Sequence, residues 1–162
     1  MRTILILRHA KSDWHTGAND FDRPLNERGK KAAPLVGAEI ASRNVLPDII
    51  LSSPAKRAKQ TTKKIAKSCG FTGDVVFVED FYYGNEQDVI NALRKLPDNY
   101  KRPLIVGHNP TLEFLIFKLM AEKQEIALPT ASLVLLKTDL KHWSELIDSS
   151  CMLEWHLRPR EL

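Results

Sequence analysis

Short aliphatic runs that alternate with longer stretches of helical periodicity are the feature of this sequence that most constrains its fold. The first run, residues 3–7, reads Thr-Ile-Leu-Ile-Leu, as expected for a strand covered on both faces. Similar runs occupy residues 48–51, 75–78 and 103–106. This alternation predicts an α/β fold: a three-layer α/β/α sandwich around a mainly parallel sheet.

Two further segments, residues 131–136 and 152–157, have strand-like composition without an obvious helix between them. We therefore expect an antiparallel addition at one edge of the sheet. Helices are predicted over residues 26–42 and 86–96, and Pro34 must kink the first of these or mark a restart.

Two dipeptides, Ser53-Pro54 and Asn109-Pro110, predict helix starts, since each places a capping side chain before a proline at the first helical position. In the first of these helices, small and apolar residues recur at helical spacing and should face the sheet: Ala55, Ala58, Thr62, Ile65 and Cys69. A row of lysines falls on another face, and a solvated surface is favoured over docking to an acidic partner: Lys56, Lys59, Lys63 and Lys67.

Composition limits the classes of protein to consider. The 162 residues suit one domain spanning 1–162. No apolar run approaches the roughly 20 residues that cross a bilayer, and the apolar start is too short for a good signal peptide, so we expect a cytoplasmic protein without a membrane partner. A net charge of +4 suits an anionic substrate, whereas the few aromatic residues do not interleave with basic ones as nucleic-acid binding would require. Cys69 and Cys151 form neither a CxxC pair nor a metal-ligand spacing, so buried thiols are expected.

Three of the predicted strands end in polar residues of one chemical kind. The first runs into Arg8-His9, the second into Ser52-Ser53 with Arg57 shortly after, and the fourth into a glycine followed by His108. In a doubly wound sheet, ligands bind beyond the carboxyl ends of the strands. We therefore expect two arginines and two histidines at one edge.

This set of side chains fits a phosphoryl group. Arginine binds phosphate oxygens bidentately, and a neutral histidine nitrogen can attack phosphorus and hold the group covalently. With cationic donors around the phosphoryl oxygens, no metal or other cofactor is needed, and the sequence lacks the carboxylate cluster that magnesium prefers. Each residue alone is a weak signal, and their coincidence at equivalent points of the topology favours the functional interpretation.

At these residues the chain resembles the histidine phosphatase superfamily, also called the phosphoglycerate mutase-like superfamily. Residues 7–10, Leu-Arg-His-Ala, are similar to its Leu-Arg-His-Gly signature, with alanine in place of glycine. Residues 52–61, Ser-Ser-Pro-Ala-Lys-Arg-Ala-Lys-Gln-Thr, match the second motif, and residues 106–108, Val-Gly-His, resemble the third. The motifs occur in the family's order and cover most of the chain.

The resemblance implies that His9 becomes phosphorylated, while Arg8, Arg57 and His108 complete the phosphate pocket. The family also uses an acidic residue that protonates the leaving group, usually after the third strand. Asp80 is the favoured counterpart here, with Glu79 as the alternative.

Within the superfamily, the Arg-His-Ala-Lys-Ser opening, residues 20–29 and residues 158–162 look most like the SixA-type protein phosphohistidine phosphatases. The short chain leaves little room for a cap over the pocket, so an open pocket that admits a side chain of another protein is expected. Lys11, Trp14 and His15, in the loop after the first strand, are candidates for contacts beyond the phosphate, or surface residues that pack on the loop.

Other functions remain open. The nearest is a small-molecule phosphomonoesterase with the same His9 chemistry. A binding module that captures phosphorylated ligands without turnover ranks lower because all four pocket residues are present. A mutase is disfavoured because it would need an enclosed site. Partners are therefore expected to be a phosphorylated protein or a small phosphorylated substrate.

Overall fold

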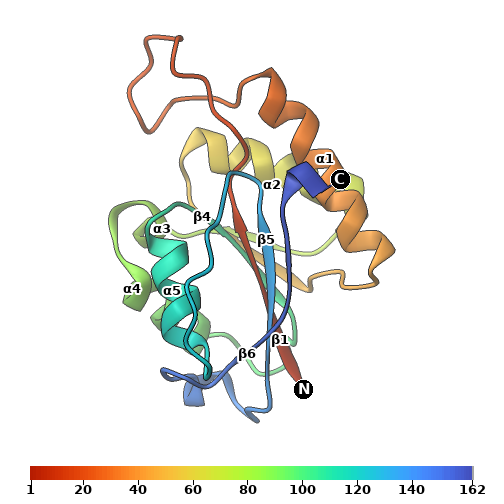
Figure 1. Cartoon of the computed structure of the whole chain (residues 1–162), viewed down its shortest axis with the longest axis vertical. Helices are drawn as coiled ribbons and strands as arrows, with labels where there is room; N and C mark the ends of the chain where they lie inside the picture. Colours follow the sequence, from red (N-terminus) through yellow and green to blue (C-terminus); the bar gives the residue numbers. More distant parts are fainter. Residues whose placement is uncertain (162) are drawn as a thin grey trace.

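The computed structural model describes residues 1–161 and contains one six-stranded sheet with the order β3-β2-β4-β1-β5-β6 (Figure 1). Its strands are β1 (Arg2–Arg8), β2 (Ile49–Ser52), β3 (Val75–Phe77), β4 (Pro103–Gly107), β5 (Leu133–Thr138) and β6 (Met152–Leu157). Strands β1 to β4 pair in parallel, whereas β5 is antiparallel to both β1 and β6. The predicted mainly parallel sheet with an antiparallel edge is confirmed.

Helices cover both faces of this sheet. They are α1 (Glu27–Ser42), α2 (Lys56–Cys69), α3 (Asp80–Tyr83), α4 (Glu86–Arg94) and α5 (Thr111–Leu119), with 3-10 turns η1 (Trp143–Glu145) and η2 (Pro159–Glu161). Helices α1 and α2 lie on one side of the sheet and α3, α4 and α5 on the other (Figure 1). The predicted α/β/α sandwich is thus observed. No helix among residues 1–161 is long and apolar enough to span a bilayer.

The aliphatic run in β1 explains why both faces are covered. Successive strand residues point to opposite faces. Leu5 and Leu7 therefore pack in the core beneath α1 and α2, whereas Ile4 and Ile6 pack in the core beneath α4 and α5. All four side chains are fully buried, and an alternating apolar and polar strand could not have been covered in this way.

Both predicted helix caps are wrong. Helix α2 begins at Lys56, two residues after Pro54, and no side chain caps it. Ser53 lies two residues before the N-cap residue Ala55, and its hydroxyl accepts the Ala55 N–H and contacts His108. Helix α5 likewise begins without a side-chain cap, because the amide of Asn109 instead donates to Glu113 and to the Leu128 carbonyl. Asn109 therefore ties a side chain of α5 to the loop at Leu128 and does not cap the helix.

The remaining predictions concern helices α1 and α2 and the two cysteines. Helix α1 continues through Pro34 without the restart that was one of the two predicted outcomes. The sheet-facing residues of α2 are buried, and its row of four lysines is exposed as predicted. Cys69 and Cys151 are buried free thiols, also as predicted.

Candidate active site

The ends of β1, β2 and β4 meet because β4 lies between the other two strands. The His9 N–H donates to the Gly107 carbonyl at 3.1 Å, and the Ser53 N–H donates to the Val106 carbonyl at 2.9 Å. The residues that follow the three strands are therefore held side by side at one edge of the sheet. Arg57 joins them from the first turn of α2.

His9 is held as a neutral imidazole with one nitrogen available. Its side chain is buried, and its Nδ1 lies 2.7 Å from the Ala10 carbonyl. A carbonyl oxygen only accepts hydrogen bonds, so Nδ1 carries the proton and Nε2 keeps its lone pair. Burial first, and then the neighbouring His108, Arg57 and Arg8, lower the pKa of His9 to about 3 against the opposing hydrogen bond to the Ala10 carbonyl. The Arg57 Nε lies 3.4 Å from His9 Nε2 and donates to it.

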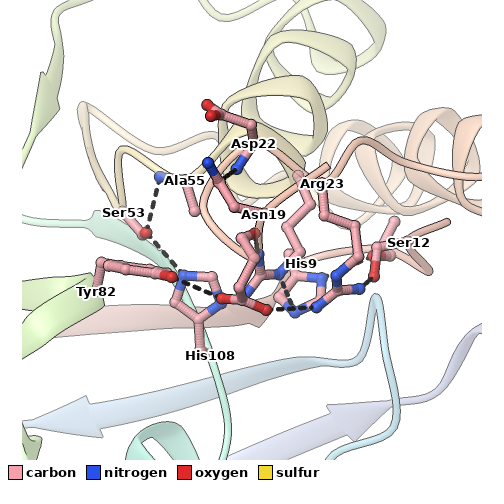
Figure 2. A network of polar contacts seen from close by, with 12 residues as sticks. His9, Ser12, Asn19, Asp22, Arg23, Ser53, Ala55, Tyr82 and His108 are labelled. Atoms are coloured by element: carbon pink, nitrogen blue, oxygen red, sulfur yellow. Dashed lines mark hydrogen bonds and ion pairs between the residues drawn. The ribbon is translucent and has the colours of Figure 1, made fainter. Parts of the chain in front are cut away.

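His108 lies beside His9, with ring centroids 5.1 Å apart. Its Nε2 is 2.7 Å from the Ser53 hydroxyl, which also accepts the Ala55 N–H (Figure 2). This arrangement favours donation from the Ser53 hydroxyl to Nε2, which places the His108 proton on Nδ1. That Nδ1 is buried and has no hydrogen-bond partner among the described residues. Burial and Arg57 lower the pKa of His108 to about 4, so it too is neutral near pH 7.

A carboxylate from the loop after β1 occupies the space beside these histidines. The Asp20 carboxylate accepts from Arg57 Nη2 at 3.2 Å, from Arg23 Nη2 at 3.0 Å and from the Tyr82 hydroxyl at 2.6 Å (Figure 2). The hydroxyl of Tyr82 first, and then the two arginines, hold the pKa of Asp20 well below its usual range. The Asp20 backbone carbonyl also accepts from Arg57 Nη1 at 2.7 Å, so both the backbone and the side chain of Asp20 bind the Arg57 guanidinium.

Arg8 completes the cationic cluster from β1. Its Nη1 donates to the Leu128 carbonyl at 3.0 Å, while its Nε is buried without a partner among the described residues. Its charge contributes to the low pKa values of both histidines. The Arg23 and Arg57 guanidinium groups thus bind one carboxylate, and Arg8 adds a third positive charge close to the two histidines. The excess of two positive charges matches a phosphoryl dianion.

Comparison with known proteins identifies this arrangement. A family model of the histidine phosphatase superfamily (branch 1) matches residues 4–81. The chain is also 31% identical over 154 residues to an uncharacterised protein of Mycobacterium tuberculosis. This alignment covers 90% of this chain and 94% of the relative. The chain belongs to the histidine phosphatase superfamily. It is accordingly a phosphatase of that superfamily.

Two solved structures are similar over the whole fold of this superfamily member. SixA of Agrobacterium tumefaciens, a proposed phosphohistidine phosphatase, has 29% identity and a TM-score of 0.84, with 98% of each chain covered. A SixA protein histidine phosphatase in complex with tungstate has a TM-score of 0.86 with the same coverage, and at 19% identity it shows the fold alone. The sequence resemblance to the superfamily is confirmed.

Four of the predicted site residues therefore lie together, namely Arg8, His9, Arg57 and His108. Asp80 lies further along the chain, where it begins α3 with an exposed side chain. Residues two apart on a helix do not share a face, so Asp80 does not face the side of Tyr82. Glu79 is three residues before Tyr82 with helical backbone angles and shares its face. Both carboxyl groups remain candidates for the acid.

The two further predicted contacts, Lys11 and His15, lie along the loop after β1. Both side chains are exposed, and both line a cavity between that loop and the start of α1. Trp14 stacks against the Arg23 guanidinium, whose carbon lies 3.6 Å from the ring centroid. The loop thus packs partly on itself, which was one of the two predicted interpretations.

Several residues that shape this superfamily site were not singled out from the sequence. Asp20 and Arg23 were visible only within the matched segment 20–29. Tyr82 was passed over because aromatic residues beside carboxylates carry no specific signal. Gln60 and Thr61, at the end of the second motif, accept the N–H groups of Leu25 and Ala10 and so hold both ends of the loop. Within residues 1–161, no group of three or more His, Cys, Asp or Glu side chains is placed to hold a metal ion.

Proposed function

We propose that this phosphatase hydrolyses phosphohistidine in proteins, through a phosphohistidine intermediate on its own His9, with residues 1–162 acting as one catalytic domain. The observation that carries the proposal is the state of His9: a buried neutral ring with its proton held on Nδ1 by the Ala10 carbonyl and its Nε2 lone pair directed toward Arg57. This is the protonation state that a nitrogen nucleophile requires.

In the first step, His9 Nε2 forms a bond to phosphorus as the bond from phosphorus to the substrate nitrogen breaks. The guanidinium groups of Arg8 and Arg57 and the N–H of His108 Nδ1 stabilise the charge on the phosphoryl oxygens. A substrate imidazole protonated on its other nitrogen leaves as neutral imidazole. It therefore depends less on an enzyme acid than an alkoxide would.

In the second step, a water molecule attacks the phosphorus on His9. The bond between phosphorus and His9 Nε2 breaks, the electron pair returns to Nε2, and the proton of the water leaves with the phosphate. Because the first step breaks one bond between phosphorus and nitrogen and forms another, transfer from one imidazole to another is nearly balanced in energy. The acid of this site then matters chiefly for ester substrates, where Asp80, or Glu79 in its place, protonates the leaving oxygen.

A protein substrate is supported by the likeness of the fold to SixA. The fold matches both SixA structures over 98% of each chain, with TM-scores of 0.86 and 0.84. The proposed activity of SixA of Agrobacterium tumefaciens points to the same substrate. In this proposal, a side chain presented by another protein approaches His9 from the strand ends.

The test is steady-state phosphate release without added metal, on a phosphohistidine peptide and on p-nitrophenyl phosphate. We expect multiple turnovers by the wild type with preference for the peptide, and loss of turnover in His9→Ala. Preference for the ester would retain the mechanism and move the substrate to small phosphomonoesters. A single phosphate captured per chain would indicate a binding module, and full activity in His9→Ala would refute the mechanism.

A further inference from the structure

A cavity of about 360 Å³ lies on the side of the His9 strand end that faces α1 and the C-terminal turn. It is formed by the first turns of α1, the loop before β5, Lys11 and the segment around η2. Its lining residues are Lys11, Arg28, Ala32, Pro129, Thr130, Ala131, Arg158, Pro159 and Arg160. Figure 1 shows the C-terminal turn beside α1, which brings segments far apart in the sequence together here.

Four of these lining residues are cationic: Lys11, Arg28, Arg158 and Arg160. Among the side chains of residues 1–160, no carboxylate lines the cavity, and none of the four cations forms an ion pair. Glu27, which directly precedes Arg28, instead pairs with Lys30 at 3.3 Å. Four like charges around one cavity repel one another unless an anion enters, so the cavity is electrostatically complementary to a polyanionic ligand.

Apart from Thr130, the rest of the lining is apolar. Ala32, Pro129, Ala131 and Pro159 contribute carbon atoms between the charged side chains. A free phosphate ion would use only the charges. A peptide segment with several Asp or Glu residues would use both, since its methylene groups can cover the apolar atoms while its carboxylates meet the cations. The lining therefore favours an acidic peptide over an inorganic anion.

The cavity is held in a fixed relation to the nucleophile. Lys11 is the second residue after His9, and the Ala131 N–H lies 3.1 and 3.0 Å from the Arg8 and His9 carbonyls. Asn26, at the start of α1, donates its N–H to the Lys11 carbonyl at 3.0 Å. Two extended residues span about 7 Å, so a group bound here is only a few residues of peptide from His9.

We propose that this cavity binds an acidic segment that flanks the phosphohistidine of the protein substrate. The inference rests on the proposed function, and it names the substrate class more narrowly: a phosphoprotein with carboxylates within a few residues of its phosphohistidine. Lys11, Arg28, Arg158 and Arg160 contact the carboxylates, while the catalytic residues contact only the phosphoryl group.

Two phosphohistidine peptides that differ only in their flanking residues, Glu in one and Gln in the other, test this. We expect the wild type to show a KM about tenfold lower for the Glu peptide at low salt, from several exposed charge contacts. In Arg28→Gln/Arg160→Gln, this ratio should fall to about twofold. Both side chains are exposed, so the fold should tolerate the change. The matched control Lys63→Gln/Lys67→Gln removes the same charge from exposed positions on α2 and should keep the tenfold ratio.

Binding without turnover separates this proposal from the proposed function. We expect the unphosphorylated Glu peptide, titrated into the His9→Ala variant, to shift the backbone amide NMR signals of residues 28–32 and 130–131. The Gln peptide should not. Shifts with no hydrolysis of either phosphopeptide by the wild type would retain the cavity and refute the proposed function. Binding of the acidic segment in this cavity is refuted if the wild type shows no preference for the Glu peptide. It is also refuted if Arg28→Gln/Arg160→Gln keeps the tenfold preference, or if Lys63→Gln/Lys67→Gln loses the preference to the same extent.

Discussion

Neutralising Asp20 should tighten the binding of phosphate, because its carboxylate occupies the cationic cluster that a phosphoryl group must enter. Asp20→Asn removes the charge and keeps the shape. The backbone carbonyl of residue 20 still accepts from Arg57 Nη1, and the new amide oxygen can still accept from the Tyr82 hydroxyl. Arg57 should therefore remain in place, now with less competition for its charge.

The size of the effect follows from the two ion pairs that are lost. They join Asp20 to Arg57 at 3.2 Å and to Arg23 at 3.0 Å. The Asp20 side chain is 52% exposed, so solvent screens both pairs, and each contributes at most about 1 kcal/mol. A total near 1 kcal/mol corresponds to about a fivefold lower Kd for phosphate.

Isothermal titration with inorganic phosphate at pH 7.5, where His9 and His108 are neutral, measures this Kd directly. Asp22→Asn is the matched control, because Asp22 lies two residues further along the same loop and points away from the cluster in Figure 2. We expect the control to change the Kd by less than twofold. If phosphate binds Asp20→Asn more weakly than the wild type, Asp20 supports the pocket rather than competes for it, and the reasoning is refuted.

Three further changes test other parts of the structure. Because the pKa values of His9 and His108 are about 3 and 4 when folded, the unfolded chain binds more protons below pH 6.5. As the pH is lowered near pH 5, the free energy of unfolding should therefore fall by about 2.5 kcal/mol per pH unit from these two groups. Urea titrations of His9→Gln should show about half that slope, and an unchanged slope would contradict the low pKa of His9. Gly29→Ala places a Cβ 2.1 Å from the Lys11 carbonyl oxygen and should lower the free energy of unfolding by about 1–3 kcal/mol; an unchanged urea midpoint would mean that α1 can shift. Of the two variants Asp80→Asn and Glu79→Gln, the one that removes the acid should lower kcat on an aryl or alkyl phosphate by about 100-fold while phosphohistidine hydrolysis stays within twofold; equal losses on both substrates would contradict the leaving-group argument.

The strands and helices could be predicted from the sequence because the hydrophobic spacing that distinguishes them extends over only a few neighbouring residues. The run at residues 3–7 could be buried only between two layers of helices, and its continuation into Arg8-His9 placed charge at a strand end. The antiparallel position of β5 and β6 also followed from the missing helix between them. The helix caps failed for the opposite reason: a Ser or Asn before a proline has several partners available. The Ser53 hydroxyl is hydrogen-bonded to His108, which follows another strand.

What the sequence by itself determined is the α/β sandwich and four side chains with phosphate chemistry, since strand order and residue type carry that information. Only the tertiary structure decided which proton His9 holds, because Nδ1 is directed at a particular carbonyl. It alone placed Asp20 among the arginines, since a loop carboxylate has no local pattern that reports its partners. It alone gathered Lys11, Arg28 and the C-terminal arginines around one cavity, because residues so distant in sequence become neighbours only when the chain packs.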